Sequence, residues 1–236
     1  VQVYVNEDKQ HRAEAFRRGE CYNVFNVLGV DNMELSHSAF LAALLNPRGS
    51  HGMQDAFLKA FIDTIAHGDT KPELDTAHAK VYTEYNIGNT TDTTGGRIDI
   101  LITDHSNTGS SKGHAIIIEN KIWATDQPNQ LLRYHNFAPK SVLLYLTLNG
   151  DEPSDQSRGG LNAQSGDYQC ISYRSDIIGW LQQCAQLAFD KPRVRETINQ
   201  YIDLLQQLTN QNTMEQKQLI QILTDKENFE QATAIE

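Results

Sequence analysis

The chain of 236 residues has few of the features that would assign it to a class at once. Its three cysteines, Cys21, Cys170 and Cys184, lie far apart, so they indicate neither a disulfide framework nor a zinc site and favour a reducing compartment. No run of about 18 apolar residues occurs, which argues against a membrane span. No charged-then-apolar signal segment opens the sequence. We therefore expect a cytoplasmic protein.

Positive charge is also scarce. Twenty Lys and Arg face 30 Asp and Glu, which gives a net charge of -10. This balance argues against a protein that coats nucleic acid nonspecifically, because such binding depends on cations that release counterions. An enzyme with one local basic groove is still compatible with it, and carboxylates gathered around a metal ion also make a chain look too negative. We find no zinc finger, helix-turn-helix signature or basic tail.

Enough apolar sequence is present, at 39%, to build a buried core. Helical periodicity covers residues 7–28, 34–45 and 53–66, and alternation of apolar and polar residues then predicts strands. The strands are expected over 80–87, 97–103, 114–122, 141–148 and 168–173, with a helix over 126–137 and two or three more helices over 175–235. The prediction is one α/β domain, residues 1–236, in which helices flank a mixed sheet of four to five strands. Its core spans about 31–175, and 176–236 forms a C-terminal helical extension.

Three charged residues interrupt the apolar strands. Asp99 lies in Arg-Ile-Asp-Ile-Leu-Ile, and Glu119 and Lys121 lie in Ile-Ile-Ile-Glu-Asn-Lys. Glu119 and Lys121 are two apart, so on a strand they point to the same side, and a carboxylate buried there needs a cation or a metal beside it. Two interpretations stay open: a divalent-metal site with a water-activating lysine, or structural ion pairs in which Arg97 and Lys121 neutralise the acids.

An ordered set of motifs resembles the PD-(D/E)XK nuclease superfamily. The set is Gly96-Arg97-Ile98-Asp99, Glu119-Asn120-Lys121 and Gln130-Leu131-Leu132-Arg133-Tyr134. Asp followed by Glu-x-Lys is the signature of that superfamily, although Ile98 stands where its name has proline. The Gln-x-x-x-Tyr element is similar to the RecB-like branch, and residues 34–52 resemble a bacterial group within the superfamily. The resemblance implies a restriction-endonuclease-like fold.

The resemblance also implies roles. Asp99 and Glu119 would bind Mg²⁺ or Mn²⁺ with help from the backbone carbonyl of Asn120, and Lys121 would orient or deprotonate the attacking water. Either Glu34, on the first core helix, or Glu84, on the first strand, would complete the metal site. Glu84 could equally be an exposed or Arg97-paired strand residue.

The resemblance adds Gln130 to the catalytic candidates, and three further residues are candidates for support of the site. Gln130 and Tyr134 are four apart on one helix face and could brace the site, contact the nucleic-acid backbone or simply pack. Arg97 and His37 are candidates for the same supporting role. His37 lies three residues after Glu34, and a structural role is favoured for it.

The function that follows is hydrolysis of nucleic-acid phosphodiester bonds, of DNA rather than RNA, in phage defence or DNA repair. An alternative is a scaffold or protein-interaction module that keeps the fold without turnover. In that case the C-terminal helices would mediate self-association.

Overall fold

The computed structural model describes residues 13–31, 33–66, 72–104 and 115–210. The C-terminal part of the expected extension, 211–236, lies outside these residues, as does the start of the helix expected over 7–28. The described elements are α2 (Val24–Leu28), α3 (Glu34–Leu45), α4 (Ala56–Ile65), β1 (Lys80–Asn86), β2 (Arg97–Thr103), β3 (Ala115–Lys121), α5 (Gln130–Phe137), β4 (Val142–Thr147), α6 (Asp155–Arg158), η2 (Ala163–Ser165), β5 (Gln169–Ser172), η3 (Tyr173–Ile177), α7 (Ile178–Leu187) and α8 (Pro192–Leu208).

The five strands form one mixed sheet in the order β1-β2-β3-β4-β5. The pairs β1–β2 and β2–β3 are antiparallel, whereas β3–β4 and β4–β5 are parallel. Helix α5 connects the parallel strands β3 and β4, as such strands need a crossover. Strand β3 is buried along its whole length, which its apolar run predicted. The mixed sheet between helices confirms the expected fold class.

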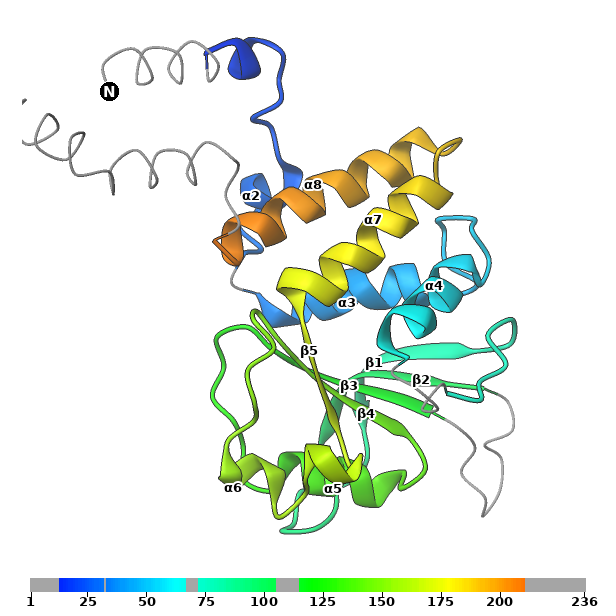
Figure 1. Cartoon of the computed structure of the whole chain (residues 1–236), viewed down its shortest axis with the longest axis vertical. Helices are drawn as coiled ribbons and strands as arrows, with labels where there is room; N and C mark the ends of the chain where they lie inside the picture. Colours follow the sequence, from blue (N-terminus) through cyan, green and yellow to red (C-terminus); the bar gives the residue numbers. More distant parts are fainter. Residues whose placement is uncertain (1–12, 32, 67–71, 105–114, 211–236) are drawn as a thin grey trace, which may run out of the picture.

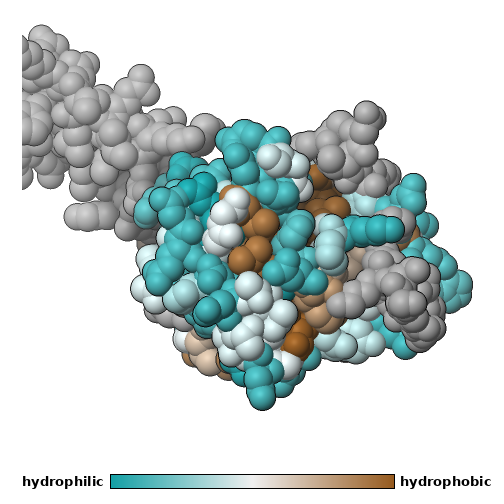
Figure 2. Space-filling model, turned by 90° about the horizontal axis from the view of Figure 1, so that it is seen from below, coloured by the Kyte–Doolittle hydropathy of each residue, from teal (hydrophilic) through white to brown (hydrophobic). Residues whose placement is uncertain are grey.

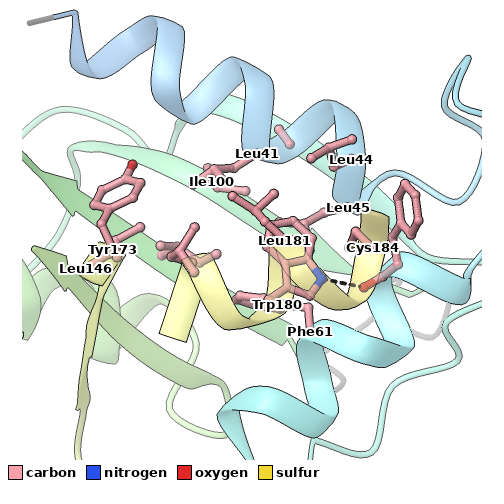
Figure 3. Packing of buried hydrophobic residues seen from close by; sticks show 14 of the residues in the cluster. Leu41, Leu44, Leu45, Phe61, Ile100, Leu146, Tyr173, Trp180, Leu181 and Cys184 are labelled. Carbon is pink, nitrogen blue, oxygen red and sulfur yellow. Dashed lines mark hydrogen bonds between the residues drawn. The ribbon is translucent and has the colours of Figure 1, made fainter. Parts of the chain in front are cut away.

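Helices cover both faces of the sheet (Figure 1). Helices α3, α4, α7 and α8 lie over one face, and α5 and α6 lie over the other. The larger core fills the first interface; its central residues include Trp180, Phe61 and Leu41 (Figure 3). The indole N–H of Trp180 donates to the backbone oxygen of Phe57 at 2.9 Å, so the one polar atom of this large side chain is satisfied.

Alternate residues of each strand serve the two cores. Ile116 and Ile118 of β3 belong to the larger cluster, whereas Ala115 and Ile117 belong to the smaller cluster on the α5 side. Side chains two apart on a strand share a face. The odd-numbered positions that follow on β3, Glu119 and Lys121, therefore lie on the α5 side.

Two predicted helices begin or end differently. The single helix expected over 7–28 is interrupted: residues 13–17 are helical, a turn with Gly19 at φ 73° follows, and Asn23 caps the start of α2. The helix expected from residue 126 begins at Gln130, because Asn129 takes a left-handed φ of 54° directly before it.

The apolar stripe of α8 packs within the chain. Ile198, Ile202 and Leu205 are all buried in the larger core, beside α7. That stripe is therefore not free to bind a partner subunit. Among the described residues no helix has the length and apolar character of a membrane span.

Candidate functional site

Three carboxylates line up across three neighbouring strands. The β2–β3 ladder ends at Ile100 opposite Ile118, so one step further Asp99 faces Glu119. On the other side of β2, Thr83 pairs with Ile100 and Tyr85 pairs with Ile98. That register places Glu84 opposite Asp99.

Glu84 is a local distortion of β1. Its φ is 53°, a left-handed value that is uncommon for a residue other than glycine. The β1–β2 pairing skips this position and continues in the same register on either side. The side chain of Glu84 forms an ion pair with Arg97, with Arg97 Nε 2.7 Å from Glu84 Oε2. Glu84 is thus both a wall residue of the cavity described below and the partner of Arg97.

Glu119 is the most buried acid of the site. It is 1% exposed, and no neutral group among the described residues donates a hydrogen bond to its carboxylate oxygens. Lys121 Nζ lies 2.8 Å from Glu119 Oε1, so the carboxylate is ion-paired at one oxygen. Burial, followed by the charge of Asp99, raises the pKa of Glu119 to about 8. Burial and the neighbouring carboxylate thus outweigh the stabilising charge of Lys121 at Glu119.

Asp99 is held by the backbone of β3. Its Oδ2 accepts a hydrogen bond from the N–H of Asn120 at 2.7 Å, which fixes the carboxylate where the two strands separate. Burial raises the pKa of Asp99 to about 6, against the opposing effect of that hydrogen bond and of Lys121. Asp99 and Glu119 therefore lie on one face and repel each other when both are ionised.

Glu34, the first residue of α3, holds the turn after β3. Its Oε1 accepts the backbone N–H groups of Ile122, Trp123 and Ala124 at 2.7, 2.9 and 2.8 Å. Although burial opposes ionisation, these bonds and Lys121 keep the pKa of the Glu34 carboxyl below its usual value. One oxygen of Glu34 is thus committed to the backbone directly beyond Lys121. This arrangement makes Glu34 a positioning residue for the end of β3.

Asn120 points to the opposite face from its two neighbours. Its amide donates to Ser38 Oγ at 3.0 Å and to the Glu34 backbone oxygen at 3.3 Å. Its Oδ1 accepts from the hydroxyl of Tyr173, also at 3.0 Å. These buried contacts join the end of β3 to α3 and η3, so they fix the strand that carries Glu119 and Lys121.

The variant Tyr173→Phe tests this support. It leaves Asn120 Oδ1 buried without that donor, which costs about 1–3 kcal/mol. In urea unfolding we expect a lower midpoint with an unchanged slope. Tyr22→Phe is the matched control, because Tyr22 is exposed. An unchanged midpoint for Tyr173→Phe would show that the hydroxyl contributes nothing to the fold.

Helix α5 closes the other side of the site. Gln130 Nε2 donates to the Tyr134 hydroxyl at 3.1 Å, and that hydroxyl donates to the backbone oxygen of Arg97 at 2.6 Å. Gln130 and Tyr134 therefore share one helix face, as their spacing predicts, and brace the start of β2. Burial and the charge of Glu119 raise the pKa of Tyr134, so its hydroxyl keeps its proton.

Arg133 is a buried residue to which sequence reasoning gave no role. Its guanidinium donates to the backbone oxygens of Gly95 and Pro128 and to the side chain of Gln127, so it fastens α5 to the β1–β2 loop. Its place between Leu132 and Tyr134 was the only signal, and an arginine there is as easily a surface residue. Its burial depends on the loop that folds over it.

Two buried histidines of the described residues, His37 and His51, lie outside the site. His37 is buried between α3 and α8, with Nδ1 2.7 Å from the Tyr201 hydroxyl and Nε2 3.2 Å from the Asp31 oxygen. Burial lowers the pKa of His37. His51 contacts the backbone at Asn46 and Met53. Neither histidine lines the cavity.

A cavity of about 520 Å³ gathers the other candidate residues. Its walls include Glu34, Glu84, Arg97, Asp99, Glu119, Asn120, Lys121, Gln130 and Tyr134. They come from α3, α5 and three strands that are distant in sequence. The face of the molecule on the α5 and α6 side is mainly hydrophilic, with smaller apolar areas near its centre (Figure 2).

The donor set of this cavity fits a divalent cation. The buried oxygens of Glu119 accept from no neutral donor among the described residues, and Asp99 lies opposite Glu119 in the register. Among the described residues no group of three or more His, Cys, Asp or Glu is placed to hold a metal ion. Two carboxylates nevertheless suffice for Mg²⁺, which completes its coordination with water and substrate phosphate oxygens.

The mixed sheet lies between helices, and Asp and Glu-x-Lys lie where two of its strands separate. This combination defines a restriction-endonuclease-like protein. A comparison with protein families identifies the PD-(D/E)XK nuclease superfamily over residues 22–203. The chain belongs to this superfamily. The match extends from before α2 into α8, well beyond the motifs. No curated protein and no solved structure shows significant similarity to the chain.

Proposed function

We propose that the protein is a metal-dependent nuclease that hydrolyses phosphodiester bonds of nucleic acid, DNA rather than RNA. Membership of the superfamily supports a nuclease-type activity. The observation that carries the proposal is the Glu119 carboxylate, which is buried at the cavity beside the Asp99 carboxylate and in contact with Lys121. A scaffold has no need for such an arrangement, because two neighbouring buried carboxylates destabilise a fold.

Asp99, Glu119 and the backbone carbonyl of Asn120 would hold Mg²⁺ or Mn²⁺. When bound, such an ion polarises the phosphate and stabilises charge on its oxygens. Glu34 and Glu84 are both candidates for completing the site. Each has one carboxylate oxygen engaged, Glu34 by the backbone after β3 and Glu84 by Arg97, and each keeps its second oxygen for the ion.

Lys121 would act on the attacking water. Burial opposes its charge, but Glu119 raises the pKa of its ammonium above the usual value. A lysine that keeps its proton orients the water and stabilises the developing negative charge instead of removing a proton. Gln130 and Tyr134 brace the cavity wall, and Arg97, 65% exposed at its side chain, is placed to meet a phosphate. The proposed cellular setting is phage defence or DNA repair.

A cleavage screen tests the proposal. The protein is incubated with single- and double-stranded DNA and RNA in Mg²⁺, in Mn²⁺ and in EDTA. We expect cleavage of DNA in the presence of metal, no cleavage in EDTA, and none by Glu119→Gln. Metal-independent cleavage, or full activity of Glu119→Gln, would contradict the assignment of the site. Absence of cleavage by the wild type on all four substrates would favour the scaffold alternative.

A further inference from the structure

Trp123 presents an aromatic surface beside the cavity. It is 61% exposed, whereas tryptophan is highly buried in most folded proteins. It follows Lys121 by two residues, and its backbone N–H is bound by Glu34 Oε1 at 2.9 Å. The N–H groups before and after it are bound by the same oxygen. The backbone that carries the indole is therefore fixed at the end of β3.

The edge of the cavity is also apolar on the side of α3. Leu35 is 58% exposed and lines the cavity, as does Ala124, the residue after Trp123. An exposed indole on a fixed backbone thus follows the end of β3, and an exposed aliphatic side chain lines the cavity together with the carboxylates. A flat apolar group would be shielded from water there, and a phosphate attached to that group would lie over the carboxylates.

The charges of the cavity do not favour a duplex. Four acids line it, Glu34, Glu84, Asp99 and Glu119, against two cations. Both cations already contact acids, Arg97 contacting Glu84 and Lys121 contacting Glu119. Duplex binding relies on many phosphate contacts, whereas single strands also gain affinity from bases that stack on aromatic side chains. A volume of about 520 Å³ is that of a small-ligand pocket.

We propose that Trp123 is a stacking platform for an unpaired nucleobase next to the scissile phosphate. The substrate class is then nucleic acid with an unpaired segment at the cavity: a single strand, a frayed end or a flap. This inference rests on the proposed nuclease function. Trp123 then makes the enzyme prefer unpaired over paired strands, while the carboxylates and Lys121 act on the phosphate.

The chain offers a direct readout, because it has two tryptophans. Trp180 is fully buried and Trp123 is exposed, so a stacked base quenches the fluorescence of Trp123. An oligothymidylate and a hairpin duplex of equal length are titrated in Mg²⁺ into Lys121→Ala protein, in which cleavage is slowed by a factor on the order of 10²–10³. We expect the single strand to quench the emission more strongly and at lower concentration than the duplex.

Substitutions of Trp123 separate the effect of ring stacking from the effect of side-chain size. In anisotropy titrations with labelled oligothymidylate, Trp123→Leu should bind about tenfold more weakly, since loss of one stacked base corresponds to roughly that factor. Trp123→Phe should keep most of the affinity. Phe189→Leu is the matched control: Phe189 is 73% exposed in the turn between α7 and α8, far from the end of β3 (Figure 1).

The possible failures can be told apart. Unchanged affinity of Trp123→Leu, equal quenching by the duplex, or no binding of either oligonucleotide would overturn the inference, whatever the cleavage screen shows. A change of oligomeric state in Trp123→Leu, without a change in binding, would show that Trp123 contacts a second copy of the chain. That result would also overturn the inference. Quenching that depends on Trp123 in a wild type without cleavage would keep the stacking site and reject the nuclease.

Discussion

Lys121→Ala is expected to lower the rate of cleavage by a factor on the order of 10²–10³, the usual loss when one preorganised charged or hydrogen-bonding group is removed from the transition state. The ammonium lies 2.8 Å from Glu119 Oε1 and lines the cavity, and in the proposed reaction it acts on both the water and the phosphate. Single-turnover cleavage in saturating Mg²⁺ measures this effect on chemistry without a contribution from product release.

Two measurements keep that loss interpretable. Lys59→Ala removes an exposed lysine on α4 that pairs with Asp55, and such surface pairs contribute little, so its rate should match the wild type. The circular dichroism spectrum of Lys121→Ala should also match. A folded Lys121→Ala protein that retains the wild-type rate would show that Lys121 has no part in the reaction.

The second large effect is on stability, and it depends on pH. In the folded protein burial raises the pKa of Asp99 to about 6 and of Glu119 to about 8. At these two carboxyls the folded state therefore binds more protons than the unfolded state between about pH 4 and pH 8, so their contribution to stability in EDTA falls as pH rises through this range. One pKa unit is about 1.4 kcal/mol and 1 kcal/mol moves Tm by about 2–4 °C at this size, so Tm should fall by about 5 °C or more between pH 5 and pH 8.

Magnesium should reverse that loss where the carboxylates are ionised. A ligand that binds only the folded state stabilises it by about 2.7 kcal/mol at one hundred times its Kd, which corresponds to roughly 5–10 °C. The rise in Tm should be larger at pH 8 than at pH 5, because protons compete with the ion at Asp99 and Glu119. Thermal melts at both pH values, with Mg²⁺ and with EDTA, measure it.

Asp99→Asn decides between the two interpretations of this carboxylate. The amide oxygen of asparagine can still accept the N–H of Asn120, while the repulsion with Glu119 disappears. We expect a higher Tm in EDTA at pH 8 and a smaller response to Mg²⁺. If Asp99 served only a structural ion pair, the variant would melt lower and the wild type would not respond to metal. The structure pairs Arg97 with Glu84, which leaves that ion pair without its expected partner.

Local pattern was enough for most of the fold. Helix α3 and strand β2 begin and end at the predicted residues, because apolar periodicity reports which face of an element is buried. The start of α5 was misplaced by four residues, since the left-handed Asn129 is a property of how the chain turns after β3. The break near Gly19 was not predicted either, because a single stripe of apolar residues does not show whether it belongs to one helix or to two.

For the site, the sequence by itself determined the acids and the lysine: charged residues in apolar strands had to be compensated, and their spacing placed Glu119 and Lys121 on one face. Only the tertiary structure decided what each one contacts. Glu34 lies 88 residues from Ile122, and Asn120 lies 53 from Tyr173. Contacts of that separation depend on how the helices pack on the sheet, which the pattern within any single segment does not encode.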